Sequence, residues 1–230
     1  MTVVKICGIT QLDLAIHALE VGANLLGFVF APSRRQVAPE GAERIIRVCR
    51  RLFPPGQCGW RAVGVFANQP LCFVRETVSR AGLDIVQLSG LETPEYCYRL
   101  ALPIFKAVHV PELARCSAGG DIASVLLGLK ASYGAARLLL DSGGSGRWGG
   151  TGTPFRWDAI GDAARDCLVA GGLDPSNVAR AVALLRPWGV DVSSGVETDG
   201  KKDPALISRF VLEVRRCDAH VDELQHVPFS

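Results

Sequence analysis

The sequence predicts an α/β fold in which eight parallel strands alternate with helices and close into a barrel. Short apolar segments recur along the 230 residues and are nearly uninterrupted in apolar character, which is typical of strands buried on both faces. A helical pattern follows most of them, and such alternation favours a parallel sheet. Glycine and polar residues gather where the strands end, as at the mouth of a (β/α)8, or TIM, barrel. We therefore expect one domain over residues 1–217 and a polar tail over 218–230. A doubly wound open sheet is the alternative.

The expected strands are short and rich in β-branched or aliphatic residues. They are Val3–Cys7, Leu25–Phe30, Ala62–Phe66, Ile85–Leu88, Ile104–Val108, Leu138–Leu140, Leu168–Ala170 and Val190–Val192.

The helices between them are predicted from apolar spacing and from capping residues. Thr10 is the expected cap of the first, and Leu12, Ile16 and Leu19 are its expected buried face. The next five are expected over Pro39–Phe53, Pro70–Ala81, Pro94–Leu102, Gly120–Tyr133 and Trp157–Asp166. The last two begin with the same signal, Asp174-Pro175 and Asp203-Pro204, in which an aspartate cap precedes a proline in the first turn.

Composition and charge exclude several classes of partner. The chain is 48% hydrophobic and 21% charged, with a formal net charge of +2 and scattered basic residues, so we expect neither a nucleic-acid nor a membrane partner. None of the eight cysteines forms a C-x-x-C pair or a zinc-finger spacing. We expect free thiols, no metal and a cytoplasmic protein.

The clearest chemical signal lies after the last two strands. The segment "LVAGGLDP" places Gly171 and Gly172 before a helix, and "VDVSSGVE" places Ser194 and Gly195 after the eighth strand. Glycine lets backbone N–H groups approach a phosphate closely, and barrels commonly bind phosphate at these two loops. The segments are alternatively two tight turns, but their position favours phosphate binding.

Two strand tips carry candidates for acid–base chemistry. Asp141 ends the sixth strand, where a carboxylate can act as a general acid, or alternatively cap a turn. Cys7 ends the first strand and is followed by Gly8. A tuned thiolate there can act as a general base, although most cysteines are buried and inert.

Other polar residues follow the second, fourth and fifth strands. Arg35 can hold a carboxylate through its forked guanidinium, or remain a solvated loop residue. Gln87 and Ser89 end the fourth strand, and His109 lies near the end of the fifth. The G-x-G-x-x-G match at 144–149 leads into more loop rather than a helix, so it does not indicate a dinucleotide site.

Several segments together resemble the phosphoribosylanthranilate isomerases of tryptophan biosynthesis. The matching stretches are "VKICGIT", "GFVFAPSRRQV", "VGVFANQ", "LDIVQLSG", "LLLDS", "GGTGTPFRW", "LVAGGLDPSNV" and "VDVSSGVE" with "GKKD". They run in order from residue 4 to residue 203.

The resemblance implies an aldose–ketose isomerase. It implies the Amadori rearrangement of N-(5-phosphoribosyl)anthranilate to 1-(2-carboxyphenylamino)-1-deoxyribulose 5-phosphate without a cofactor. Asp141 would be the general acid that opens the ribose ring, and Cys7 the general base that removes the C2′ proton. Arg35 would hold the anthranilate carboxylate and Gln87 would bind substrate, with phosphate at Gly171, Gly172, Ser194 and Gly195. A small phosphosugar would be the partner of a monomer or homodimer.

Two positions depart from the family pattern. Ser89 stands where the family usually has histidine in "QLHG", and Thr153 stands where it has lysine in "GGTGKTFDW". Two other functions remain as alternatives. One is a different phosphosugar isomerase or epimerase, and the other is a barrel that binds a phosphate ligand without turnover.

Overall fold

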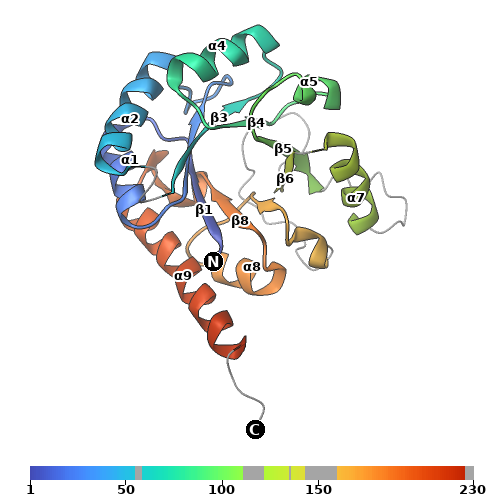
Figure 1. Cartoon of the computed structure of the whole chain (residues 1–230). Helices are drawn as coiled ribbons and strands as arrows, with labels where there is room; N and C mark the ends of the chain where they lie inside the picture. The colour runs from blue at the N-terminus through green and yellow to red at the C-terminus, as the bar shows by residue number, and fades with distance from the viewer. Residues whose placement is uncertain (55–58, 111–121, 135, 143–159, 226–230) are drawn as a thin grey trace.

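The computed structural model describes residues 1–54, 59–110, 122–134, 136–142 and 160–225, without the side chains of 220–225. Eight parallel strands form a closed barrel in sequence order, with the helices arranged around the outside (Figure 1). The first strand pairs with the eighth, with Lys5 opposite Asp191. This closing pair excludes the open doubly wound sheet.

The strands lie close to the positions predicted from the sequence. They are β1 Val3–Cys7, β2 Leu25–Val29, β3 Arg61–Phe66, β4 Ile85–Leu88, β5 Ile104–His109, β6 Arg137–Asp141, β7 Leu168–Val169 and β8 Gly189–Val192. Every strand end lies within one residue of its expected bound. A small hairpin of β9 Glu197–Thr198 and β10 Lys201–Lys202 follows β8.

The outer layer consists of α-helices and one short 3-10 helix. They are α1 Leu12–Glu20, α2 Pro39–Leu52, α4 Leu71–Ala81, α5 Pro94–Tyr98, α7 Ile122–Tyr133, η2 Gly161–Ala164, α8 Val178–Leu185 and α9 Pro204–Gln225. A second 3-10 helix, η3 Ser194–Val196, follows β8 at the mouth. Between barrel and helices, apolar side chains form the main core, and α9 contributes Ile207, Phe210, Val211 and Val214 to it, as predicted.

Several helix starts and ends differ from the prediction. Gln11, in an extended conformation, precedes α1 in place of the expected Thr10 cap, and Leu12 is exposed. Helix α8 begins at Val178 because Asp174 accepts hydrogen bonds from Ser176 N and Oγ in a local turn that competes with the helix. The Asp203 cap is confirmed, since its Oδ1 accepts from Ala205 N at 2.8 Å.

Two further helices are shorter than expected. Helix α5 ends at Tyr98, and Pro103 disfavours helical backbone at Leu102 just before it. The expected sixth helix is the 3-10 helix η2, and residues 157–159 lie outside the described part.

Helix α9 runs through the boundary that we placed at residue 217, as far as Gln225. Asp218 lies in this helix and accepts hydrogen bonds from Thr2 N and Oγ1. Arg215 bonds Thr2 O at 2.7 Å, Gly22 O at 3.0 Å and Asn24 Oδ1 at 3.0 Å. Helix α9 is therefore tied directly to the start of β1 and to the turn after α1.

Candidate functional site

A cavity opens at the mouth of the barrel, where the carboxyl ends of the strands meet. Of the predicted site residues, seven line it: Cys7, Arg35, Gln87, Asp141, Gly171, Gly172 and Ser194. Gly195 follows Ser194 in η3 but is not part of the lining. The strand tips therefore meet in one place, as predicted.

Cys7 is the last residue of β1 and its side chain lies in the barrel interior. Gly8 then turns the chain with a φ of 83°, in the left-handed region that favours glycine. The Cys7 side chain is buried, and this burial raises the pKa of its thiol above its usual value despite the neighbouring Lys5. A proton-accepting role for Cys7 therefore needs a positive charge close by.

Asp141 is the last residue of β6 and pairs with His109, the last residue of β5. Both side chains line the cavity. Gly171 lies directly beside this tip, since a Cβ atom there would come within 2.3 Å of Ser142 N and 2.6 Å of Asp141 Oδ1. Only glycine fits at position 171, which keeps the tip of β6 next to the loop after β7.

The glycine-containing loops after β7 and β8 are in contact. Gly171 and Gly172 have φ values of 83° and 66°, which side chains rarely allow. A Cβ atom on Gly195 would lie 1.9 Å from Leu173 O, so the two loops touch through glycine. Asn177 fixes the first loop by donating to Gly172 O at 2.8 Å. The two segments predicted to bind phosphate form one surface.

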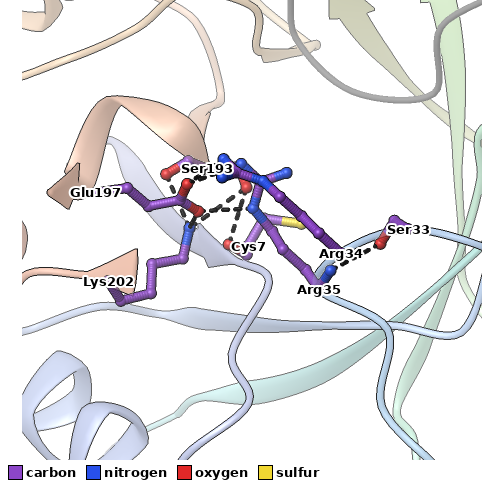
Figure 2. Close-up of polar contacts among 7 residues, drawn as sticks. All are labelled: Cys7, Ser33, Arg34, Arg35, Ser193, Glu197 and Lys202. Atoms are coloured by element: carbon purple, nitrogen blue, oxygen red, sulfur yellow. Dashed lines mark hydrogen bonds and ion pairs between the residues drawn. The ribbon is translucent and has the colours of Figure 1, made fainter. Parts of the chain in front are cut away.

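Arg35 is held in a cluster of charges that the sequence analysis missed. Its Nε and Nη2 donate to the two oxygens of Glu197 at 2.6 and 2.9 Å, and Arg34 donates to the same carboxylate. Lys202 donates to Glu197 Oε1 and to Ser193 O, both at 2.8 Å. Figure 2 shows these cations converging on Glu197 next to Cys7. Although burial opposes ionisation, the bonds from Arg35 and Lys202 lower the pKa of Glu197 to about 2.

The wall formed by β4 and β5 is polar. Gln87 Nε2 donates to Ser89 Oγ at 3.1 Å, and both residues line the cavity. Gln87 Oε1 and His109 Nδ1 are buried without a hydrogen-bond partner among the described residues. Buried polar atoms are nearly always paired, so these two are suited to polar groups of a ligand.

Asp191 also lines the cavity, although its sequence pattern predicted no site role. Its partner is Lys5, whose Nζ lies 2.9 Å from both carboxylate oxygens. The sequence does hold a signal for this pair, since each of two apolar strands contains one charged residue. Buried charges need partners, so the two residues could have been expected to pair. Glu197 and Lys202 carry no local signal of this kind.

Within the described part of the chain, no cluster of three or more histidine, cysteine or acidic side chains is arranged to hold a metal ion. The six cysteines that the structure describes are free thiols: Cys7, Cys49, Cys72, Cys97, Cys167 and Cys217. None of the described helices combines the length and apolar character needed to cross a bilayer. Thr153 and the glycine-rich segment 143–152 lie outside the described residues.

Comparison with known proteins identifies the family. The sequence profile of the N-(5'-phosphoribosyl)anthranilate (PRA) isomerase family matches residues 4–213. The chain belongs to this family. The resemblance in the strand-tip motifs is thereby confirmed over nearly the whole barrel.

Individual PRA isomerases are similar along their full length. The protein of that name from Desulforudis audaxviator is 45% identical over 213 residues, covering 92% of this chain and 97% of the relative. The one from Moorella thermoacetica is 41% identical over 223 residues, covering 96% and 92%.

Solved structures of PRA isomerases share the fold. The crystal structure of the Thermotoga maritima enzyme superimposes with a TM-score of 0.76 at 35% identity, covering 94% of this chain and all of that one. A second structure holds reduced 1-(o-carboxyphenylamino)-1-deoxyribulose 5-phosphate and has a TM-score of 0.71 at 33% identity, with the same coverage. Another shows monomers of the dimeric T. maritima enzyme, with a TM-score of 0.71 at 33% identity and the same coverage.

Proposed function

We propose that this protein, a PRA isomerase of tryptophan biosynthesis by family, rearranges N-(5-phosphoribosyl)anthranilate with Asp141 as general acid and Cys7 as general base. The observation that carries the assignment is the shared cavity. Cys7 from β1 and Asp141 from β6 line one space, and the contiguous glycine loops after β7 and β8 border it. An acid and a base on different sides of a bound sugar suit a rearrangement that protonates one atom and deprotonates another.

The cavity offers a separate place for each part of the substrate. The loops with Gly171, Gly172, Ser194 and Gly195 suit the phosphate, because exposed backbone N–H groups bind phosphate well. Arg35 suits the anthranilate carboxylate. A guanidinium carries five N–H groups, and the bonds to Glu197 use two of them. Gln87 Oε1 suits a donor on the ribose or the amine.

The proposed reaction uses the two groups in turn. Asp141 protonates the ring oxygen, the bond from this oxygen to C1′ breaks, and the amine nitrogen forms a C1′=N iminium. The iminium acidifies the C2′ proton, which the Cys7 thiolate accepts to give an enolamine. The enolamine gains a proton at C1′ and loses the hydroxyl proton at C2′, giving the ketone. Substrate and product are isomers, so no external group is consumed.

The departure at Ser89 fits this arrangement. Ser89 Oγ accepts from Gln87 Nε2, which directs the amide oxygen of Gln87 to the other side of the side chain. We infer that Ser89 positions Gln87.

We also propose that the protein acts on a small phosphosugar as a monomer or homodimer in the cytoplasm.

The test is to follow the fluorescence of freshly made N-(5-phosphoribosyl)anthranilate after adding the purified protein. We expect rapid decay with the unaltered protein and a drop in kcat of about 10²–10⁴-fold in Asp141→Asn and in Cys7→Ala, with unchanged circular dichroism. Cys72→Ala and Asp162→Asn are matched controls, because Cys72 is exposed on α4 and the Asp162 side chain is 86% exposed in η2.

Each outcome separates the functions. Normal turnover by Cys7→Ala contradicts the base role, and normal turnover by Asp141→Asn contradicts the acid role. A folded, unaltered protein that binds a product analogue without any decay is the result expected of a phosphate-binding barrel without turnover.

A further inference from the structure

A buried lysine lies directly below the cavity. Lys5 is two residues before Cys7 on β1, so both side chains point to the same face of the strand. It is fully buried, and its Nζ lies 2.9 Å from both oxygens of Asp191 on β8. A buried ion pair is weak evidence for stability, since apolar residues of similar volume often serve as well. The pair therefore calls for a functional explanation.

The same ammonium group is also next to Cys7. Lys5 opposes the effect of burial on Cys7, since burial raises the pKa of the thiol and the charge of Lys5 lowers it. Gly27 on β2, opposite Cys7 in the sheet, leaves room for both side chains. A Cβ atom there would lie 2.9 Å from Cys7 Sγ and 3.2 Å from Lys5 Nζ, so both atoms border the same point. Lys5 thus lies beside a carboxylate and a thiol in the barrel interior.

The charges around Cys7 differ in what else they bind. Those in its surroundings are Lys5 on β1, Asp191 on β8, Lys202 on β10, Arg35 after β2, and Asp141 and His109 across the cavity. Glu197 already binds both Lys202 and Arg35. Lys5 lies on the same face of β1 as the thiol, and it lowers the pKa of Cys7 more than Lys202 does. Burial alone would lower the pKa of Lys5, but Asp191 and Cys7 outweigh it and raise this pKa, so the group stays charged.

We propose that the Lys5 ammonium is the counter-ion of the Cys7 thiolate and that Asp191 holds it in place and shares its charge. Lys5 is then a positioning residue that acts through Cys7, and Asp191 moderates it. The catalytic meaning of this arrangement rests on the proposed role of Cys7 as base. The charge pairing itself is independent of turnover.

The proposal predicts opposite effects from the two partners. Lys5→Met removes the positive charge and should raise the pKa of Cys7, whereas Asp191→Asn keeps the shape, removes the negative charge and should lower it. Lys5→Arg keeps the charge and should stay near the unaltered protein. Lys106→Met is the matched control, because Lys106 is also buried and paired, but with Glu92 at 3.1 Å. A purely structural role for the pair gives no such opposition.

The measurement is the pH dependence of the rate at which iodoacetamide alkylates Cys7, with mass spectrometry of the Cys7 peptide to separate it from other thiols. We expect Lys5→Met to shift the midpoint upward by about one pH unit or more, so that the alkylation rate below the midpoint falls about tenfold. We expect Asp191→Asn to shift the midpoint downward. Lys5→Arg should partly or fully restore the midpoint, and Lys106→Met should leave it in place. The pH profile of kcat/KM should move in the same directions.

The proposal is overturned if Lys5→Met and Asp191→Asn leave the alkylation midpoint unchanged or shift it in the same direction. Should Lys5→Met not fold, Asp191→Asn decides alone, since an absent or upward shift contradicts the pairing. Failure of the proposed function has a different signature. In that case Cys7→Ala retains turnover while the alkylation midpoints still shift in opposite directions.

Discussion

At the scale of single residues, the site depends on how Glu197 organises positive charge. One carboxylate with a side chain 4% exposed accepts from Arg34, Arg35 and Lys202. The bidentate contact fixes the plane of the Arg35 guanidinium, which a substrate carboxylate would then meet in a set orientation. In the proposed substrate complex, Glu197 therefore acts through Arg35.

We expect Glu197→Gln to destabilise the protein by about 2 kcal/mol at neutral pH. The pKa of Glu197 is about 2 in the folded protein, below its ordinary value of 4.5. Its stabilising contribution is therefore complete above about pH 4.5 and is lost as the pH falls toward 2. Urea unfolding of both proteins at several pH values should show a difference that shrinks below pH 4.5.

Glu76→Gln is the control, because Glu76 is exposed on α4 and its substitution should change stability by less than about 0.5 kcal/mol. A Glu197→Gln deficit that stays constant or grows as the pH falls would contradict the charge-based explanation.

At the scale of elements, the loops after β7 and β8 act as one unit. Their contact is set by Gly195 against Leu173, while Asn177 and Asp174 stabilise the turn before α8. The local turn at Asp174 delays the start of α8 to Val178, and the glycines precede both the expected and the observed start.

We expect Gly195→Ala to weaken phosphate binding because the new methyl group would overlap Leu173 O and separate the loops. Competitive inhibition by inorganic phosphate should weaken about tenfold or more, a change of about 1.4 kcal/mol. Gly41→Ala is the matched control, since a Cβ atom on that α2 residue meets nothing within 4 Å. Equal inhibition constants for Gly195→Ala and the unaltered protein would show that the loops do not bind phosphate together.

At the scale of the whole molecule, the barrel is closed by residues from both ends of the chain. Strand β1 pairs with β8, and α9 packs against both α1 and α8. Arg215 on α9 joins Thr2, Gly22 and Asn24, so the last helix holds the first strand and the turn after α1 (Figure 1). These contacts lie away from the mouth residues.

We expect Arg215→Ala to lower the free energy of unfolding by about 2–3 kcal/mol, because several acceptors lose their donor. Turnover at 25 °C should change little, since Arg215 is not among the cavity residues. Arg216→Ala is the matched control, with a side chain 66% exposed, and should cost less than about 0.5 kcal/mol. Equal unfolding midpoints for the two variants would show that the closing contacts contribute little.

Sequence and structure agree most closely where the signals are local. Apolar runs predicted all eight strands to within one residue at each end, because a strand buried on both faces leaves its signature in consecutive residues. The Asp203-Pro204 start of α9 is confirmed, because Asp203 Oδ1 accepts a hydrogen bond from the backbone N–H of Ala205, two residues later. Asp174 does not cap α8 because its side chain accepts from Ser176 in a local turn, and Gln11 rather than Thr10 precedes α1.

The sequence by itself determined the fold and the family, because continuous apolar runs mark the strands and family motifs accompany their ends. It also identified Cys7, Gln87 and Asp141 as candidate site residues, because they lie at or next to strand ends. Only the tertiary structure decided which charges meet. Lys5 and Asp191 are 186 positions apart, and Arg35 and Glu197 are 162 apart. Barrel closure brings each pair together, and the local sequence around one residue does not identify its partner. The partners in these ion pairs are therefore known only from the tertiary structure, whereas the residues at strand ends can be predicted from the sequence.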